Sequence, residues 1–134
     1  MQTINEAAAE FLANKRVAVT GVSRTPKTHG SNNVYRRLRE RGYQVFAVNP
    51  NTGQVEGDRC YPDLASIPDA VQMVDVFRRS EYVAEVAAAA IAKGASVLWC
   101  QLGVVDREAA ARARAAGMTV VMDRCPAIEY GRLF

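Results

Sequence analysis

Short apolar runs alternate with longer amphipathic segments along the chain, and this alternation predicts the order of strands and helices. The first run, residues 16 to 20 (RVAVT), is rich in valine and ends at Gly21, which is typical of a buried parallel strand. The same patterns predict further strands at 44–48, 73–77, 96–100 and 118–122, and helices at 32–41, 81–93 and 107–116. This order indicates an α/β fold, which we expect to be a three-layer, Rossmann-like, doubly wound parallel sheet of about five strands in a single domain.

Residues at the ends of the predicted segments support these boundaries. Gly94 follows the apolar stripe of 81–93 and is a usual helix-terminating residue, and Asp106 is well placed to cap the helix at 107–116. Glycines and prolines interrupt the segment from Asn51 to Ala70, so we expect a loop there, with one short turn at 64–67.

Size and composition fit one folded domain over residues 1–134, because 49% hydrophobic residues are enough to bury a core. Apolar residues in 1–15 recur at helical spacing without a continuous run. We therefore expect an N-terminal helix packed on the domain, and neither a signal peptide nor a membrane span.

The charge pattern does not favour nucleic acid as a partner, because the net charge is only +3 and no dense basic tract is present. Arg36, Arg37, Arg39 and Arg41 are expected on the solvated face of a helix. The three cysteines are far apart and lack the spacing of metal ligands, so we expect no metal site and reduced thiols in the cytoplasm.

Ligands of doubly wound sheets bind outside the carboxyl ends of the strands, so the residues just after each strand are the candidates for function. After the first strand, the backbone amides of Gly21, Val22 and Ser23 can approach a pyrophosphate, and Arg24 and Lys27 add positive charge. The GxGxxG fingerprint of dinucleotide sites is absent, and a tight turn without a ligand explains a lone glycine equally well.

The second strand ends at Asn49 and Pro50, where an NAD site normally carries an acidic residue. The missing acid disfavours NAD and, less strongly, NADP, whose site accepts an arginine. Asn49 can still hydrogen-bond a sugar or an adenine, and Pro50 turns the chain.

The third and fourth strands also end in candidate binding residues. Phe77 can flank an adenine while Arg78 pairs with a phosphate; the alternative is that Phe77 lies in the core and Arg78 in solvent. Gln101 and Gly103 can contact an extended arm that carries amides.

Two cysteines follow strands and are candidates for thiol redox chemistry. Cys125 comes after the last strand beside Arg124, whose charge can lower the pKa of the thiol, and Cys100 ends the fourth strand. An inert, partly buried thiol is an equally good interpretation.

The segments VAVTGVSR, GYQVFAVNP, VDVFRR, WCQLGV and VVMDRCPAIE are specific in this order and spacing. Through them the chain resembles, over nearly its whole length, the CoA-binding protein family, whose small stand-alone domains are similar to the CoA-binding domain of the succinyl-CoA synthetase α subunit. The resemblance implies that coenzyme A lies across the strand ends. It implies these contacts: Gly21, Val22 and Ser23 near the diphosphate, Arg24 and Lys27 on phosphates, Asn49 and Pro50 near the nucleotide end, Phe77 and Arg78 flanking the nucleotide, Gln101 and Gly103 facing the pantetheine.

The resemblance does not extend to ligase chemistry. His29, the only histidine, lies in the first loop and is misplaced for a phosphohistidine, and the chain shows no complete catalytic set. We therefore expect a non-catalytic binding, carrier or sensor module for CoA or an acyl-CoA. A monomer or weak homo-oligomer that acts with an acyl-CoA enzyme would fit. The alternatives are an NAD(P)-dependent oxidoreductase and a redox protein that forms a mixed disulfide with CoA.

Overall fold

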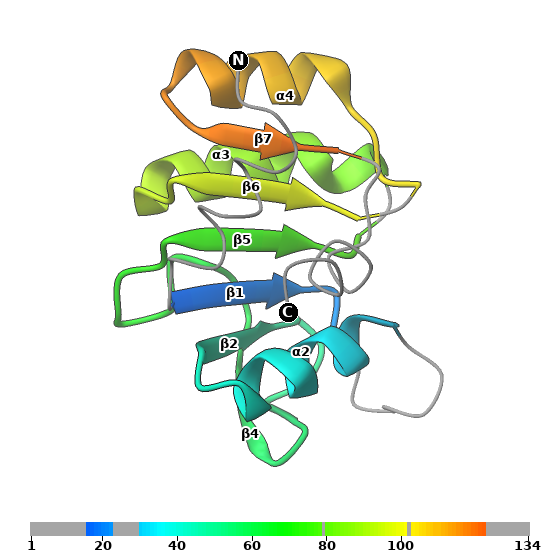
Figure 1. The fold of residues 1–134 in the computed structure, drawn as a ribbon, viewed down its shortest axis with the longest axis vertical. Helices are drawn as coiled ribbons and strands as arrows, with labels where there is room; N and C mark the ends of the chain where they lie inside the picture. The colour runs from blue at the N-terminus through cyan, green and yellow to red at the C-terminus, as the bar shows by residue number, and fades with distance from the viewer. Residues whose placement is uncertain (1–15, 23–29, 79, 102, 123–134) are drawn as a thin grey trace.

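The computed structural model describes residues 16–22, 30–78, 80–101 and 103–122, and the structural statements below concern these residues. Five parallel strands form the centre of the sheet (Figure 1): β1 (Arg16–Thr20), β2 (Gln44–Val48), β5 (Met73–Val76), β6 (Val97–Cys100) and β7 (Thr119–Val121). Two short strands, β3 (Gln54–Val55) and β4 (Asp58–Tyr61), extend the sheet, and the full strand order is β3-β4-β2-β1-β5-β6-β7. The expected three-layer α/β fold is thus confirmed.

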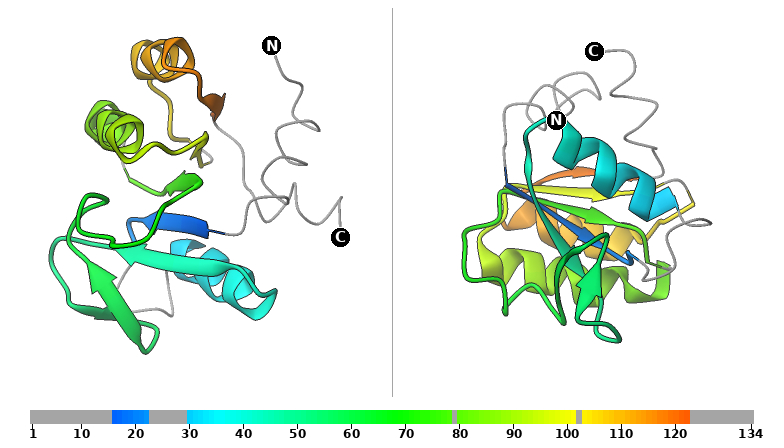
Figure 2. Two further views of the ribbon diagram at one scale, coloured as in Figure 1. Left: turned by 90° about the vertical axis from the view of Figure 1, so that its left-hand side faces the viewer. Right: turned by 90° about the horizontal axis from the view of Figure 1, so that it is seen from below.

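Helices cover both faces of the sheet, as the predicted alternation requires (Figure 2). Helix α2 (Gly30–Glu40) packs on one face, while α3 (Val83–Lys93) and α4 (Arg107–Ala115) pack on the other. A single 3₁₀ turn, η2 (Ser80–Tyr82), precedes α3. The five central strands are buried along nearly their whole length, because their alternate residues join two apolar clusters on opposite faces.

The expected helix ends are confirmed. Helix α3 ends at Gly94, and the side chain of Asp106 caps α4 by accepting a hydrogen bond from the Ala109 amide at 3.0 Å. The turn at 64–67 is also present, with the Ile67 amide donating to the Leu64 carbonyl at 3.2 Å. The helix expected at 1–15 lies outside the described residues.

The expectation that 51–70 holds only a loop and a turn is wrong. The segment contains an antiparallel hairpin of β3 (Gln54–Val55) and β4 (Asp58–Tyr61), and β4 runs parallel to β2 as a sixth strand. Glu56 and Gly57 form the hairpin turn with φ of 52° and 82°. Strands this short give too few alternating positions for a sequence pattern to reveal them.

The arginines of α2 lie on its solvent-facing side, as expected, and two of them also form ion pairs there. Arg36 pairs with Glu56 at 3.1 Å, and Arg39 pairs with Asp58 at 2.7 Å. The Tyr35 hydroxyl donates to Asp58 at 2.6 Å, and this bond is the main reason why the Asp58 pKa is lowered. The polar side of α2 is therefore joined to the β3–β4 hairpin by ion pairs and hydrogen bonds.

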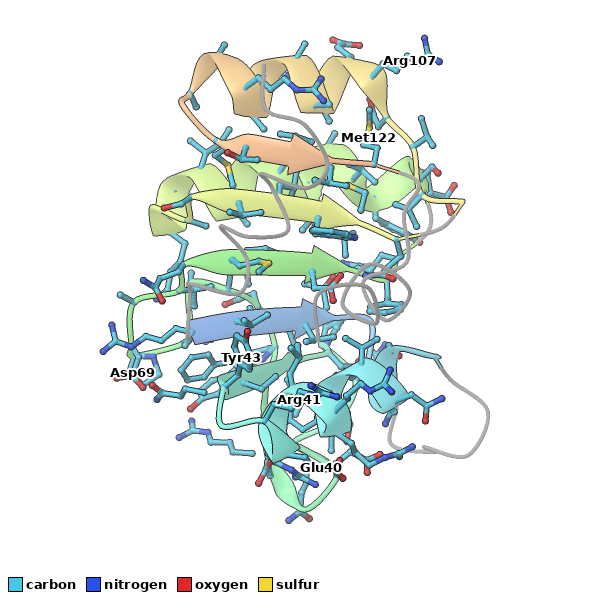
Figure 3. The ribbon with its side chains drawn as sticks, in the orientation of Figure 1. Glu40, Arg41, Tyr43, Asp69, Arg107 and Met122 are labelled. Atoms are coloured by element: carbon cyan, nitrogen blue, oxygen red, sulfur yellow. The ribbon has the colours of Figure 1, made fainter. Side chains whose placement is uncertain are left out.

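The two edges of the sheet differ in their polar contacts. At the amino ends of the strands, Gln44 donates to Asp69 at 3.2 Å, and the Tyr43 side chain is buried (Figure 3). The loops at the carboxyl ends carry the residues singled out from the sequence.

Within the described residues, no helix is both long and apolar enough to cross a membrane.

Candidate functional site

The sheet reverses its strand order beside β1, and two loops meet there. The chain passes from β1 to β2 on one side and later returns to β5 on the other. Gly21, after β1, has a φ of +83°, and a Cβ at this position would lie 2.8 Å from the carbonyl oxygen of Phe77. Backbone crowding therefore requires a glycine here, at the point of a doubly wound sheet where ligands bind.

A pocket of about 520 Å³ opens at this edge, between the ends of β1 and β2, the turn after β4, and α3. Its apolar lining includes Val48, Leu64 and Val86, which are buried, while Asn51, Asp63, Arg78 and Glu85 supply polar groups. The remaining lining residues are Thr20, Gly21, Asn49, Pro50, Pro62 and Ala89. An apolar lining with a few polar groups suits a flat organic ring.

Asn49 ties the loops around this pocket together. Its Nδ2 donates to the Val22 carbonyl at 2.7 Å, and its Oδ1 accepts from the Asn51 amide at 2.8 Å. Its own backbone amide donates to the Tyr61 carbonyl at 2.9 Å. Asn49 therefore braces the loops after β1, β2 and β4, and its side chain is already engaged on both polar atoms.

Arg78 is the cation of the pocket lining. Its guanidinium lies over the ring of Tyr82, 4.3 Å from the ring centroid, and it forms no ion pair within the described part of the chain. The ring orients the guanidinium without neutralising it. Arg78 therefore keeps its charge for an anionic ligand.

Four residues selected from the sequence thus line one pocket: Gly21, Asn49, Pro50 and Arg78. Phe77 does not join them, because its side chain packs against the buried cluster on the α2 side of the sheet. Val22 is fully buried in the same cluster, so only its backbone is available to a ligand. Ser23, Arg24, Lys27 and Cys125 lie outside the described residues.

The loops after β5 and β6 are joined through Ser80, which the sequence analysis missed. Its hydroxyl donates to the Gly103 carbonyl at 3.3 Å and accepts from the Val105 amide at 3.0 Å. Gln101, also selected from the sequence, is buried beside Asp75 instead of lining the pocket.

Asp75 is a second residue that the sequence analysis missed. It is fully buried in β5, its Oδ1 accepts a hydrogen bond from Gln101 Nε2, and its Oδ2 has no partner among the described residues. Burial raises the pKa of this carboxyl to about 8. A carboxyl in the apolar run MVDVF was the signal available in the sequence.

Cys100 lacks the properties of a redox thiol. It is fully buried, and burial is the main cause that raises its pKa to about 12. A thiol that is neither exposed nor ionised does not exchange readily with disulfides, so the structure speaks against the redox role considered for Cys100. No cluster of three or more metal-ligating side chains occurs in the described part of the chain.

Comparison with known proteins places the chain in one family. The family model for the CoA binding domain matches residues 15–131. An uncharacterized protein of Bacillus subtilis, YneT, is 36% identical over 117 residues, covering 87% of this chain and 86% of that protein. The structure of a hypothetical protein from Pyrococcus horikoshii superimposes with a TM-score of 0.92 at 38% identity, covering 98% of this chain and 92% of that one.

A larger protein carries a related segment. The ADP-forming acetate–CoA ligase II of Archaeoglobus fulgidus is 38% identical over 82 residues, which are 60% of this chain and only 12% of the ligase. The resemblance seen in the strand-end motifs is confirmed by the family model, and this chain belongs to the CoA-binding domain family.

Proposed function

We propose that this chain binds coenzyme A or an acyl-CoA at the carboxyl edge of its sheet, as a binding, carrier or sensor module without a reaction of its own. One observation carries the proposal. In a chain of the CoA-binding domain family, the pocket beside the strand-order reversal is lined by Gly21, Asn49, Pro50 and Arg78, which follow three different strands.

The chemistry of the pocket suits the adenine of the nucleotide end. Its volume of about 520 Å³ and its apolar lining at Val48, Leu64 and Val86 favour a flat ring. The carboxylates of Asp63 and Glu85 can accept hydrogen bonds from an exocyclic amino group. Hydrogen bonds from Ser66 lower the pKa of Asp63 and so favour its carboxylate form.

The same carboxylates repel phosphates, so the phosphates of CoA are proposed to lie outside the adenine pocket. Arg78, at its rim, is one partner for them. The loop after β1 is the other, since its sequence carries Arg24 and Lys27. The Gly21 amide already donates to the Val48 carbonyl at 3.2 Å, so we expect the amides from Val22 onward to meet the diphosphate.

The two alternative functions receive less support. At the end of β2, where an NAD site presents an acid to the ribose, Asn49 stands with its side chain engaged in bracing the loops. A mixed disulfide with CoA would depend on Cys125, because Cys100 is buried.

The proposal is tested by calorimetry with CoA, acetyl-CoA, dephospho-CoA, NAD and NADP, under reducing conditions and at fixed salt. We expect saturable binding of CoA and acetyl-CoA, weaker binding of dephospho-CoA, which lacks the 3′-phosphate, and no binding of the nicotinamide nucleotides. Binding of NAD or NADP in preference to CoA would refute the proposal.

A further inference from the structure

Asp75 occupies the middle of the sheet, where a charged side chain is costly. It lies in β5 between Val19 of β1 and Trp99 of β6, and all three residues are fully buried. The other residues of β5 are apolar. An ionised carboxylate in such a place needs a cation or several hydrogen bonds to compensate the loss of water.

The described surroundings do not supply that compensation. Asp75 forms no salt bridge with a described residue, and its Oδ2 has no hydrogen-bond partner among them. Its one side-chain contact is the bond that Gln101 Nε2 donates to Oδ1. This environment favours an uncharged carboxyl at neutral pH, in agreement with the raised pKa.

Gln101 connects this carboxyl to the ligand edge of the sheet. It is the first residue after β6, and its backbone is fixed on both sides: its amide donates to the Val76 carbonyl at 3.1 Å, and its carbonyl accepts from Val104 at 2.9 Å. With Nε2 directed at Asp75, Oε1 lies on the opposite branch of the amide. Gln101 is 4% exposed and lies outside the pocket lining, but its Oε1 has no donor among the described residues and is not one of their fully buried, unpartnered side-chain atoms. It therefore remains a fixed acceptor at the edge of the sheet.

We propose that Asp75, as an uncharged carboxyl, is a positioning residue that orients Gln101 so that its Oε1 accepts a hydrogen bond from an amide N–H of the pantetheine arm. This inference rests on the proposed CoA site and adds to it a residue that does not touch the ligand. The pantetheine arm carries two amide groups, and adenosine 3′,5′-bisphosphate, which lacks the arm, carries none. Asp75 and Gln101 should therefore affect binding of the arm and leave binding of the nucleotide end unchanged.

The test compares CoA with adenosine 3′,5′-bisphosphate, which lacks the arm, by calorimetry on the wild type and three variants. Q101L removes the amide, D75L keeps the branching of the side chain but removes the acceptor, and D75N keeps an uncharged acceptor. We expect Q101L and D75L to weaken CoA binding by about three- to tenfold, the net effect of one hydrogen bond. Binding of the bisphosphate should not change, and D75N should bind CoA within about twofold of the wild type.

Other outcomes separate the inference from the function on which it rests. Equal loss of CoA and bisphosphate binding in D75L would mean a purely structural role, and loss of CoA binding in D75N to the level of D75L would mean that the charge is required. Either result overturns the inference while the CoA site stands, as does unchanged CoA binding in Q101L. Failure of the wild type to bind either ligand overturns both. If D75L does not fold, the CoA affinities of Q101L and D75N still test the inference.

Discussion

The side chain of Asn49 donates a hydrogen bond to the backbone carbonyl of Val22 at 2.7 Å, and so joins the loop after β2 to the loop after β1. Asn49→Asp replaces this donor by a carboxylate that faces a carbonyl, so we expect a loss of about 1–3 kcal/mol in the free energy of unfolding. We also expect no gain of NAD binding, although an acid then stands where NAD sites carry one. Denaturant unfolding and calorimetry measure both effects.

Asn33→Asp is the matched control for this substitution. Asn33 is exposed on α2, and its Oδ1 accepts from Arg36, a role that an aspartate retains. We expect its stability to stay within about 0.5 kcal/mol of the wild type. A similar loss in both variants would show that the added charge, and not the broken bond to Val22, is responsible.

Arg78 is expected to supply a charged contact to the bound coenzyme. Arg78→Gln should weaken CoA binding by about ten- to a hundredfold, as for a hydrogen bond to an ionised group, and the loss should shrink at high salt. Arg107→Gln, an exposed position on α4 away from the pocket lining, should leave the affinity unchanged. Equal affinities of the two variants would remove Arg78 from the site.

Gly21 combines a left-handed backbone with a crowded neighbourhood, and these two effects can be separated. Gly94→Ala places a Cβ on a residue with φ +80° and no atom within 4 Å, so it should cost about 1–2 kcal/mol for the backbone alone. Gly21→Ala meets the Phe77 carbonyl as well and should cost about 1–3 kcal/mol more. Denaturant unfolding measures both, and equal losses would contradict the crowding.

The buried carboxyl of Asp75 makes stability depend on pH. Its pKa is about 8 in the folded protein and near 3.8 in the unfolded chain, so between these values the folded state holds one more proton. Raising the pH through this window therefore favours unfolding, by at most about 1.4 kcal/mol per pH unit. Above the pKa of the folded state, Asp75 is ionised in both states, and it no longer makes the stability change with pH.

The D75N variant isolates this contribution, because its side chain does not titrate. The stability of D75N relative to the wild type should increase from pH 5 to pH 8, about the range that the pKa defines. Parallel denaturant unfolding of both proteins across this range gives the difference. A difference independent of pH would mean that Asp75 does not change its protonation on unfolding.

The central fold was predictable because its signals are local. Five apolar runs bounded by glycine or polar residues correspond to the five central strands, and the ends of β1 and β2 lie where the pattern puts them. The β3–β4 hairpin was missed because it is held by tertiary contacts. Arg36 and Arg39 of α2 bind Glu56 and Asp58, 20 and 19 residues away, and a helical pattern cannot show such pairs.

Some residues of the pocket could be predicted from the sequence, and others could not. Gly21, Asn49 and Arg78 follow strands, and the carboxyl ends of parallel strands meet at one edge. Leu64 and Glu85 come from a turn and a helix whose approach to that edge depends on packing. The separation of Phe77 from Arg78 was not predictable, because both residues follow the end of β5 and only the packing of Phe77 on the α2 side separates them.

The most direct test of the account is a titration of the ¹⁵N-labelled protein with CoA, followed by the backbone amide resonances. We predict that the largest shifts occur at the carboxyl edge, at Val22, Asn51 and Leu64, and that Tyr43 and Asp69 at the opposite edge do not respond. Saturating shifts confined to the carboxyl edge would place CoA where we propose. Shifts centred on the opposite edge, or none at saturating CoA, would contradict the account.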